Sequence, residues 1–202
     1  MKISIEDIKK LKELSGAGLT DAKKALEEAK GDFDKALEAM RKKGLTKAEK
    51  RGDREAREGL IDSYIHDGRI GAILELNCET NFVAKTDTFK ELAHYLAMQI
   101  ASMNPLYISE ADIPQADLDR VRKECEDKLK DDKKPADVKK KIIDGQVKKR
   151  FEEKVLYNQP YILDDSITVE TLIKNYIAKT GENIVVRQFK RMELGVTEST
   201  SQ

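Results

Sequence analysis

The dipeptide Asp67-Gly68 constrains the fold most, because it divides residues 60–76 into two runs in which apolar and polar side chains alternate. Asp-Gly is a favoured two-residue turn between antiparallel strands. A two-residue loop places Ile65 opposite Ile70, and their side chains are expected on the buried face of the sheet. The chain is therefore expected to contain an antiparallel sheet with one buried face and one solvent-exposed face.

Three short amphipathic helices are predicted before this hairpin, within residues 1–45. Asp32 is placed to cap the third helix, which is expected to end near Gly44. The apolar faces are rich in alanine, which favours a compact bundle of the ubiquitin-associated type that serves as a binding module. Leu19 follows a glycine-rich turn and is a candidate contact residue, although packing into the module's own core is an equal alternative. Residues 46–58 are predicted to form a charged linker.

Residues 59–195 are predicted to form one α+β core, followed by a disordered polar tail over 196–202. Within the core we expect, after the hairpin, a helix from Thr88 to Met103, an antiparallel helix pair over 114–156, a helix over 168–180 and a strand over 183–194. The predicted fold is thus α+β: a three-helix module, an antiparallel sheet with covering helices, and a helical hairpin arm.

The composition excludes several classes of function. Lysine and arginine number 38, as do aspartate and glutamate, so no global field attracts nucleic acid or an anionic membrane. The mean hydropathy is −0.62, no apolar run is long enough to span a bilayer, and no signal peptide is apparent.

The two cysteines fit a reducing cytoplasm, and the two histidines show no metal-ligand spacing with them. No nucleophile or phosphate-binding glycine loop is recognisable, so we expect no enzyme, no cofactor and no metal.

The segment 77–83 joins the predicted hairpin to the next helix, and loops held between rigid elements often carry function. Its aromatic residue, Phe82, is flanked by small polar groups and is a candidate probe for a pocket in a partner. The alternative is that Phe82 covers the core of its own domain. The residues alone favour this alternative.

Three separated segments resemble the elongation factor Ts family, whose members exchange guanine nucleotide on elongation factor Tu. Ser15-Gly16-Ala17-Gly18 with 21–26 is similar to the family's N-terminal segment, Glu75 to Ala84 to its Asn-Cys-Glu-Thr-Asp-Phe-Val run, and Gly181 to Arg187 to its Gly-Glu-Asn-Ile-x-x-Arg segment. The resemblance covers nearly all of residues 1–195. The length resembles the family's shorter bacterial form, which implies a homodimer through the C-terminal core.

The resemblance implies a role for particular residues. The loop Thr80, Asn81, Phe82 and Val83 would enter elongation factor Tu near its nucleotide, where Phe82 wedges between helices and disturbs the magnesium and phosphate contacts. Leu11 and Leu19 would hold the GTP-binding domain. Position 81 is asparagine where the family pattern has aspartate, which removes a charge that could act on the magnesium shell.

A second hypothesis is a helical adaptor without exchange activity. Its N-terminal module would bind ubiquitin-like folds or other proteins, and the remainder would be a dimerising scaffold. The adaptor leaves the matches over 75–84 and 181–187 unexplained, so the exchange factor is preferred. A nucleotide-dependent partner would distinguish the two.

Overall fold

A computed structural model describes residues 3–15, 17–130, 132 and 134–196 of the chain. Gly16 of the glycine-rich turn and residues 197–202 of the predicted tail lie outside this range. The chain divides into two compact units, one formed by 1–101 with 171–202 and the other by 102–170. The predicted domain limits remain a prediction.

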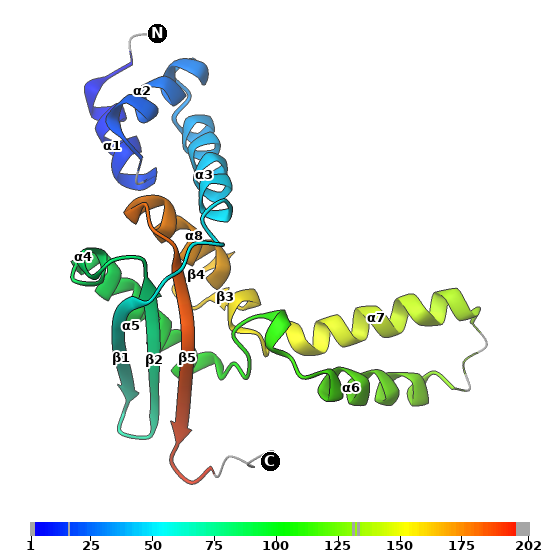
Figure 1. Ribbon diagram of the computed structural model, residues 1–202. Helices are drawn as coiled ribbons and strands as arrows, with labels where there is room; N and C mark the ends of the chain where they lie inside the picture. The colour runs from blue at the N-terminus through cyan, green and yellow to red at the C-terminus, as the bar shows by residue number, and fades with distance from the viewer. Residues whose placement is uncertain (1–2, 16, 131, 133, 197–202) are drawn as a thin grey trace. The chain divides into compact units, whose positions relative to one another are not determined.

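The N-terminal module consists of α1 (Ile5–Ser15), α2 (Leu19–Glu28) and α3 (Phe33–Glu49) (Figure 1). Asp32 caps α3 as expected, since its carboxylate accepts a hydrogen bond from the Lys35 backbone N–H at 3.1 Å. The helix does not end near Gly44. Gly44 lies inside α3, and a β-carbon there would lie 3.2 Å from the Ala178 side chain, so this close approach suits glycine. The first part of the predicted linker is therefore helical.

A three-stranded antiparallel sheet forms the centre of the first unit, in the order β1 (Glu58–His66), β2 (Ile70–Cys78), β5 (Ile184–Glu193). The turn lies where the sequence predicts it, with φ of 50° at Asp67 and 66° at Gly68. However, His66 pairs with Ile70, so Arg69 is an extra residue in the loop. The predicted pairing of Ile65 with Ile70 is wrong by one position, and Ile65 lies opposite Gly71.

This shift decides which side chains the sheet buries, because neighbouring strand residues point to opposite faces. The buried face of β2 carries Ala72, Leu74, Leu76 and Cys78. Ile61 and Ile65 of β1 lie on the other face and are 69% and 70% exposed, contrary to the expectation for Ile65. Ile73 shares that face and is also exposed. We call Ile61, Ile65 and Ile73 the open apolar face.

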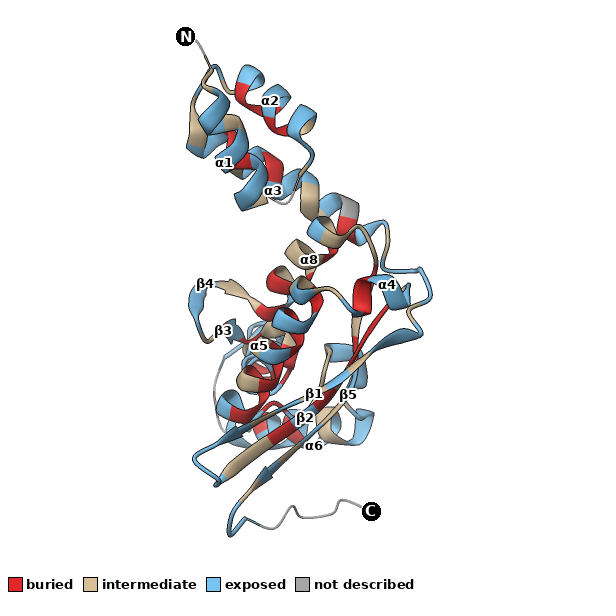
Figure 2. Cartoon of the chain, turned by 90° about the vertical axis from the view of Figure 1, so that its left-hand side faces the viewer, coloured by how far each residue is buried: buried red, intermediate tan, exposed pale blue. Residues whose placement is uncertain are grey.

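Helices cover the buried face of the sheet: α4 (Asn81–Ala84) follows β2, and α5 (Asp87–Met103) and α8 (Val169–Thr180) turn their buried sides toward it (Figure 2). The buried side chains of α5 include Phe89, Leu92, Leu96 and Ile100, as the apolar stripe predicts. The cap is Thr86 and not Thr88, because the Phe89 N–H donates to Thr86 Oγ1 at 3.3 Å.

The second unit contains the predicted antiparallel helix pair, α6 (Gln115–Lys128) and α7 (Ala136–Glu152). Its core consists of Val121, Cys125, Ile143, Val147 and Phe151. Two 3₁₀ turns (Glu110–Asp112 and Leu156–Asn158) and a small sheet of β3 (Pro160–Tyr161) and β4 (Asp164–Thr168) were not expected from the sequence. Across the described residues, no helix combines the length and apolar character needed to cross a bilayer.

Candidate functional site

The short helix α4 presents Phe82 to solvent. Thr80 precedes it, and the Thr80 side chain accepts a hydrogen bond from the Val83 N–H at 3.4 Å, as N-cap residues do. Val83 and Ala84 are buried, and the packing of these two side chains fixes the position of the helix. Phe82 lies on the opposite side and is 83% exposed. The alternative that Phe82 covers its own core is therefore wrong.

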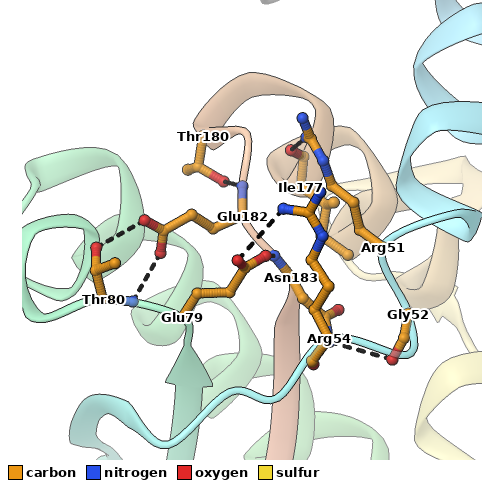
Figure 3. A network of polar contacts seen from close by, with 9 residues as sticks. All are labelled: Arg51, Gly52, Arg54, Glu79, Thr80, Ile177, Thr180, Glu182 and Asn183. Carbon is orange, nitrogen blue, oxygen red and sulfur yellow. Dashed lines mark hydrogen bonds and ion pairs between the residues drawn. The ribbon is translucent and has the colours of Figure 1, made fainter.

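Glu182 anchors the same turn from a distant part of the chain. Its carboxylate accepts hydrogen bonds from the Thr80 N–H at 2.9 Å and from the Thr80 hydroxyl at 2.6 Å. Glu182 follows Gly181, whose φ of 82° ends α8 in the left-handed conformation that glycine adopts without strain. Figure 3 shows the Glu182 side chain extending from this helix end to Thr80.

Glu79 and Asn183 join the turn to the segment that precedes β1. Glu79 accepts a hydrogen bond from the Asn183 backbone N–H at 2.7 Å and pairs with Arg54 at 3.4 Å. The buried amide of Asn183 donates to the carbonyl oxygens of Gly52 and Arg54 at 3.2 and 2.7 Å. These contacts bring residues 52–54, 79–80 and 182–183 together (Figure 3). The ends of β2 and α8 and the segment 52–54 thus form one polar support for the turn that carries Phe82.

The predicted contact residues of the N-terminal module differ in exposure. Leu19 is 54% exposed at the start of α2, so the alternative that it packs fully into the module's core does not hold. Leu11 is completely buried, together with Ala22, Leu26 and Met40. A side chain in this position cannot contact a partner directly, so the role predicted for Leu11 is corrected to support of the module's core.

Glu79, Glu182 and Asn183 were not among the predicted site residues. Their contacts join positions more than 100 residues apart, which no local spacing reveals. The only signal was that all three fall within segments that resemble a known family. Among the described residues, no group of three or more His, Cys, Asp or Glu side chains is arranged to hold a metal ion.

Cys78 lies directly beneath the turn and is expected to be unreactive. Burial raises the pKa of its thiol to about 11, which leaves about one molecule in a thousand as thiolate at pH 8. We predict that a Cys125→Ser variant, which isolates Cys78, reacts slowly with Ellman's reagent when native and rapidly when unfolded. The native reaction should accelerate as the pH rises toward 11, because only the thiolate attacks. Rapid modification at neutral pH would contradict the burial of this thiol.

Comparison with known proteins adds a second line of observation. The sequence model of the family described as Elongation factor TS matches residues 2–195. The chain is 51% identical over 196 residues to an elongation factor Ts of Thermotoga sp. (strain RQ2), covering 96% of this chain and 98% of that protein. It is 48% identical over 200 residues to an elongation factor Ts of Thermoanaerobacter sp. (strain X514), covering 98% of both chains. An elongation factor Ts of Thermodesulfovibrio yellowstonii is 46% identical over 198 residues, covering 98% of this chain and 99% of that protein.

Proposed function

Because the chain belongs to the elongation factor Ts family, a family of translation elongation factors, we propose that it is the guanine-nucleotide exchange factor for elongation factor Tu. It binds elongation factor Tu loaded with GDP, accelerates GDP release and so allows GTP to bind during translation elongation in the cytoplasm. It makes and breaks no covalent bond, so it acts as a binding protein and not as an enzyme.

The observation that carries this proposal is the exposure of Phe82 on a turn whose backbone is already fixed. The buried Val83 holds one end of the turn, and the hydrogen bonds between Thr80 and Glu182 hold the other. Burying an exposed aromatic side chain in a partner costs little conformational entropy when the backbone that carries it is already ordered. Burial of one phenylalanine contributes about 1.5–3 kcal/mol, which corresponds to roughly a 10- to 150-fold change in an equilibrium. Phe82 can therefore weaken nucleotide binding substantially if its insertion and the bound nucleotide exclude each other.

The chemistry of the turn favours a steric mechanism. Phe82 would enter between helices near the nucleotide of elongation factor Tu and displace the groups that hold magnesium and phosphate. Asn81 is also exposed but carries no charge, so it cannot compete for the magnesium ion by charge. Thr80 and Val83 would set the direction of entry, since one caps α4 and the other is buried under it.

A second contact is needed, because one phenylalanine contributes too little to displace a tightly held nucleotide. The N-terminal module offers exposed Leu19 for this contact, with Leu11 supporting it from within the core. The coupling must be reciprocal: if this chain weakens GDP binding, GDP weakens the binding of this chain by the same factor.

Reciprocity supplies a direct test of the proposal. The chain should form a stable complex with nucleotide-free elongation factor Tu on size-exclusion chromatography, and added GDP should dissociate it. A complex that ignores GDP would favour the adaptor hypothesis. A folded chain that forms no complex with a matched elongation factor Tu would refute the proposed function.

We also propose that two copies of the chain pair through the open apolar face. Ile61, Ile65 and Ile73 project from two adjacent strands on a face that no described helix of this unit covers. An exposed apolar patch on a sheet commonly marks an interface. A two-fold axis would place the same patch on both copies, so an apolar surface meets an apolar surface.

Ile65→Glu is predicted to convert the dimer into a monomer, because each interface would bury two unpaired carboxylates. Sedimentation velocity over a range of protein concentrations measures this change. Leu163→Glu is the control, since Leu163 is similarly exposed but lies in the second unit. A wild-type chain that stays monomeric, or an Ile65→Glu chain that stays dimeric, would overturn the proposed interface.

A further inference from the structure

Residues 52–57 pass over the ends of β2 and β5 in the first unit (Figure 1). A pocket of about 590 Å³ is lined by this segment and the two strands. Its lining is polar and is dominated by three arginines. The principal lining residues are Arg54, Arg57, Arg187, Glu55, Asn77 and Asn183. The pocket shares Gly52, Arg54 and Asn183 with the polar support of the turn, but Phe82 itself does not line it.

One of the three guanidinium groups is uncommitted. Arg54 pairs with Glu79 at 3.4 Å, and Arg57 pairs with Glu55 at 2.6 Å. Arg187 has neither an ion pair nor a hydrogen-bond partner among the residues that the structure describes. It ends the segment 181–187, in which Gly181, Glu182 and Asn183 all have structural roles at the Phe82 turn. Arg187 is thus the charged residue of that segment whose role remains open.

Asn77 provides a second, independent observation. This β2 residue is only 7% exposed and lines the pocket. Its side-chain oxygen, Oδ1, is buried and has no hydrogen-bond donor among the described residues. A buried acceptor without a donor is rare in folded proteins and is often completed by a ligand or a water molecule.

A ligand that satisfies both groups offers a negative charge to Arg187 and a hydrogen-bond donor to Asn77. A carboxylate matches the planar fork of a single guanidinium. A phosphate at neutral pH could also pair with Arg187, but it brings additional negative charge close to Glu55 and offers Asn77 few donors. An aspartate or glutamate within a peptide has backbone N–H groups beside its carboxylate.

We propose that this pocket binds an acidic peptide segment of a protein partner. The peptide carboxylate pairs with Arg187, and a peptide N–H donates to Asn77 Oδ1. Arg54 and Arg57 add positive potential at the rim while keeping their own glutamate partners. The site does not depend on the exchange activity, so it can be tested on the isolated chain.

The test is an NMR titration of the ¹⁵N-labelled full chain with acetyl-Gly-Glu-Gly-amide. Saturable shifts are expected at the Arg187 Nε–H and the Asn77 side-chain amide. Acetyl-Gly-Gln-Gly-amide should cause no such shifts. Acetate, which has the carboxylate but no N–H donor, should bind at least threefold more weakly than the glutamate peptide.

Matched variants locate the site. Arg187→Gln should weaken binding of the glutamate peptide at least tenfold, whereas Arg69→Gln, an exposed arginine at the opposite end of the sheet, should leave it unchanged. An absence of shifts at both groups, equal binding by Arg187→Gln, or tighter binding of inorganic phosphate than of the peptide would each overturn the proposal.

Discussion

Replacing Phe82 by alanine is expected to slow GDP release from elongation factor Tu by roughly 10- to 150-fold at a fixed concentration of the chain. The expected factor follows from the loss of about 1.5–3 kcal/mol when one phenylalanine is no longer buried in the partner. Because Phe82 is 83% exposed in the free chain, its removal leaves the chain's own core intact. Stopped-flow fluorescence of a labelled GDP measures the rate.

Two variants at the neighbouring position serve as controls for Phe82→Ala. Asn81→Ala tests whether any change in the turn is harmful, and Asn81→Asp restores the charge of the family pattern. Both should alter the release rate less than tenfold if the aromatic side chain acts by its bulk. An effect of Asn81→Asp larger than this, or an unaltered rate with Phe82→Ala, would show that the bulk of Phe82 does not drive GDP release.

Glu182→Ala is expected to slow GDP release about tenfold, although Glu182 does not touch the partner in the proposed mechanism. The substitution removes the two hydrogen bonds that Glu182 accepts from Thr80. A hydrogen bond to a charged group contributes about 1.5–3 kcal/mol, and partial solvent exposure favours the lower end. The released turn would spend a smaller fraction of its time in the orientation that presents Phe82. The apparent affinity of the chain for elongation factor Tu falls in proportion to that fraction.

A double-mutant cycle separates this positioning role from a general loss of stability. Thr80→Val removes the hydroxyl that makes one of the two contacts with Glu182, so its effect should be less than additive with that of Glu182→Ala. Glu182→Gln keeps one acceptor oxygen and should lie between wild type and alanine. Urea unfolding should show that every variant remains folded under the conditions of the release assay. Fully additive effects, or a loss of release that merely follows the loss of stability, would exclude positioning by Glu182.

Sequence patterns were sufficient for features that depend on neighbouring residues. Asp32 lies at a helix N-cap, Gly181 at a helix end, and Asp67-Gly68 in a hairpin turn, and each is set by the local backbone. The apolar stripe of α5 was readable for the same reason, since its spacing is that of one helix. The α+β class follows from these elements and was predicted correctly.

The errors occurred where one residue or a distant contact decides the outcome. Arg69 adds one position to the hairpin loop, and this reversed the expected burial of Ile65. Leu11 and Leu19 are both apolar, yet only tertiary packing determines that Leu11 is buried and Leu19 exposed. The Glu182–Thr80 contact spans 102 positions, so the support of the Phe82 turn could not be derived from spacing.

The rate of GDP release from purified elongation factor Tu, measured with and without the wild-type chain, tests the central claim most directly. The account predicts that release accelerates as the chain's concentration increases and then reaches a plateau, as expected when a ternary complex forms and loses nucleotide. A release rate that stays at the spontaneous value, with the chain shown to be folded and the elongation factor Tu shown to bind GDP, would contradict the assignment of exchange activity.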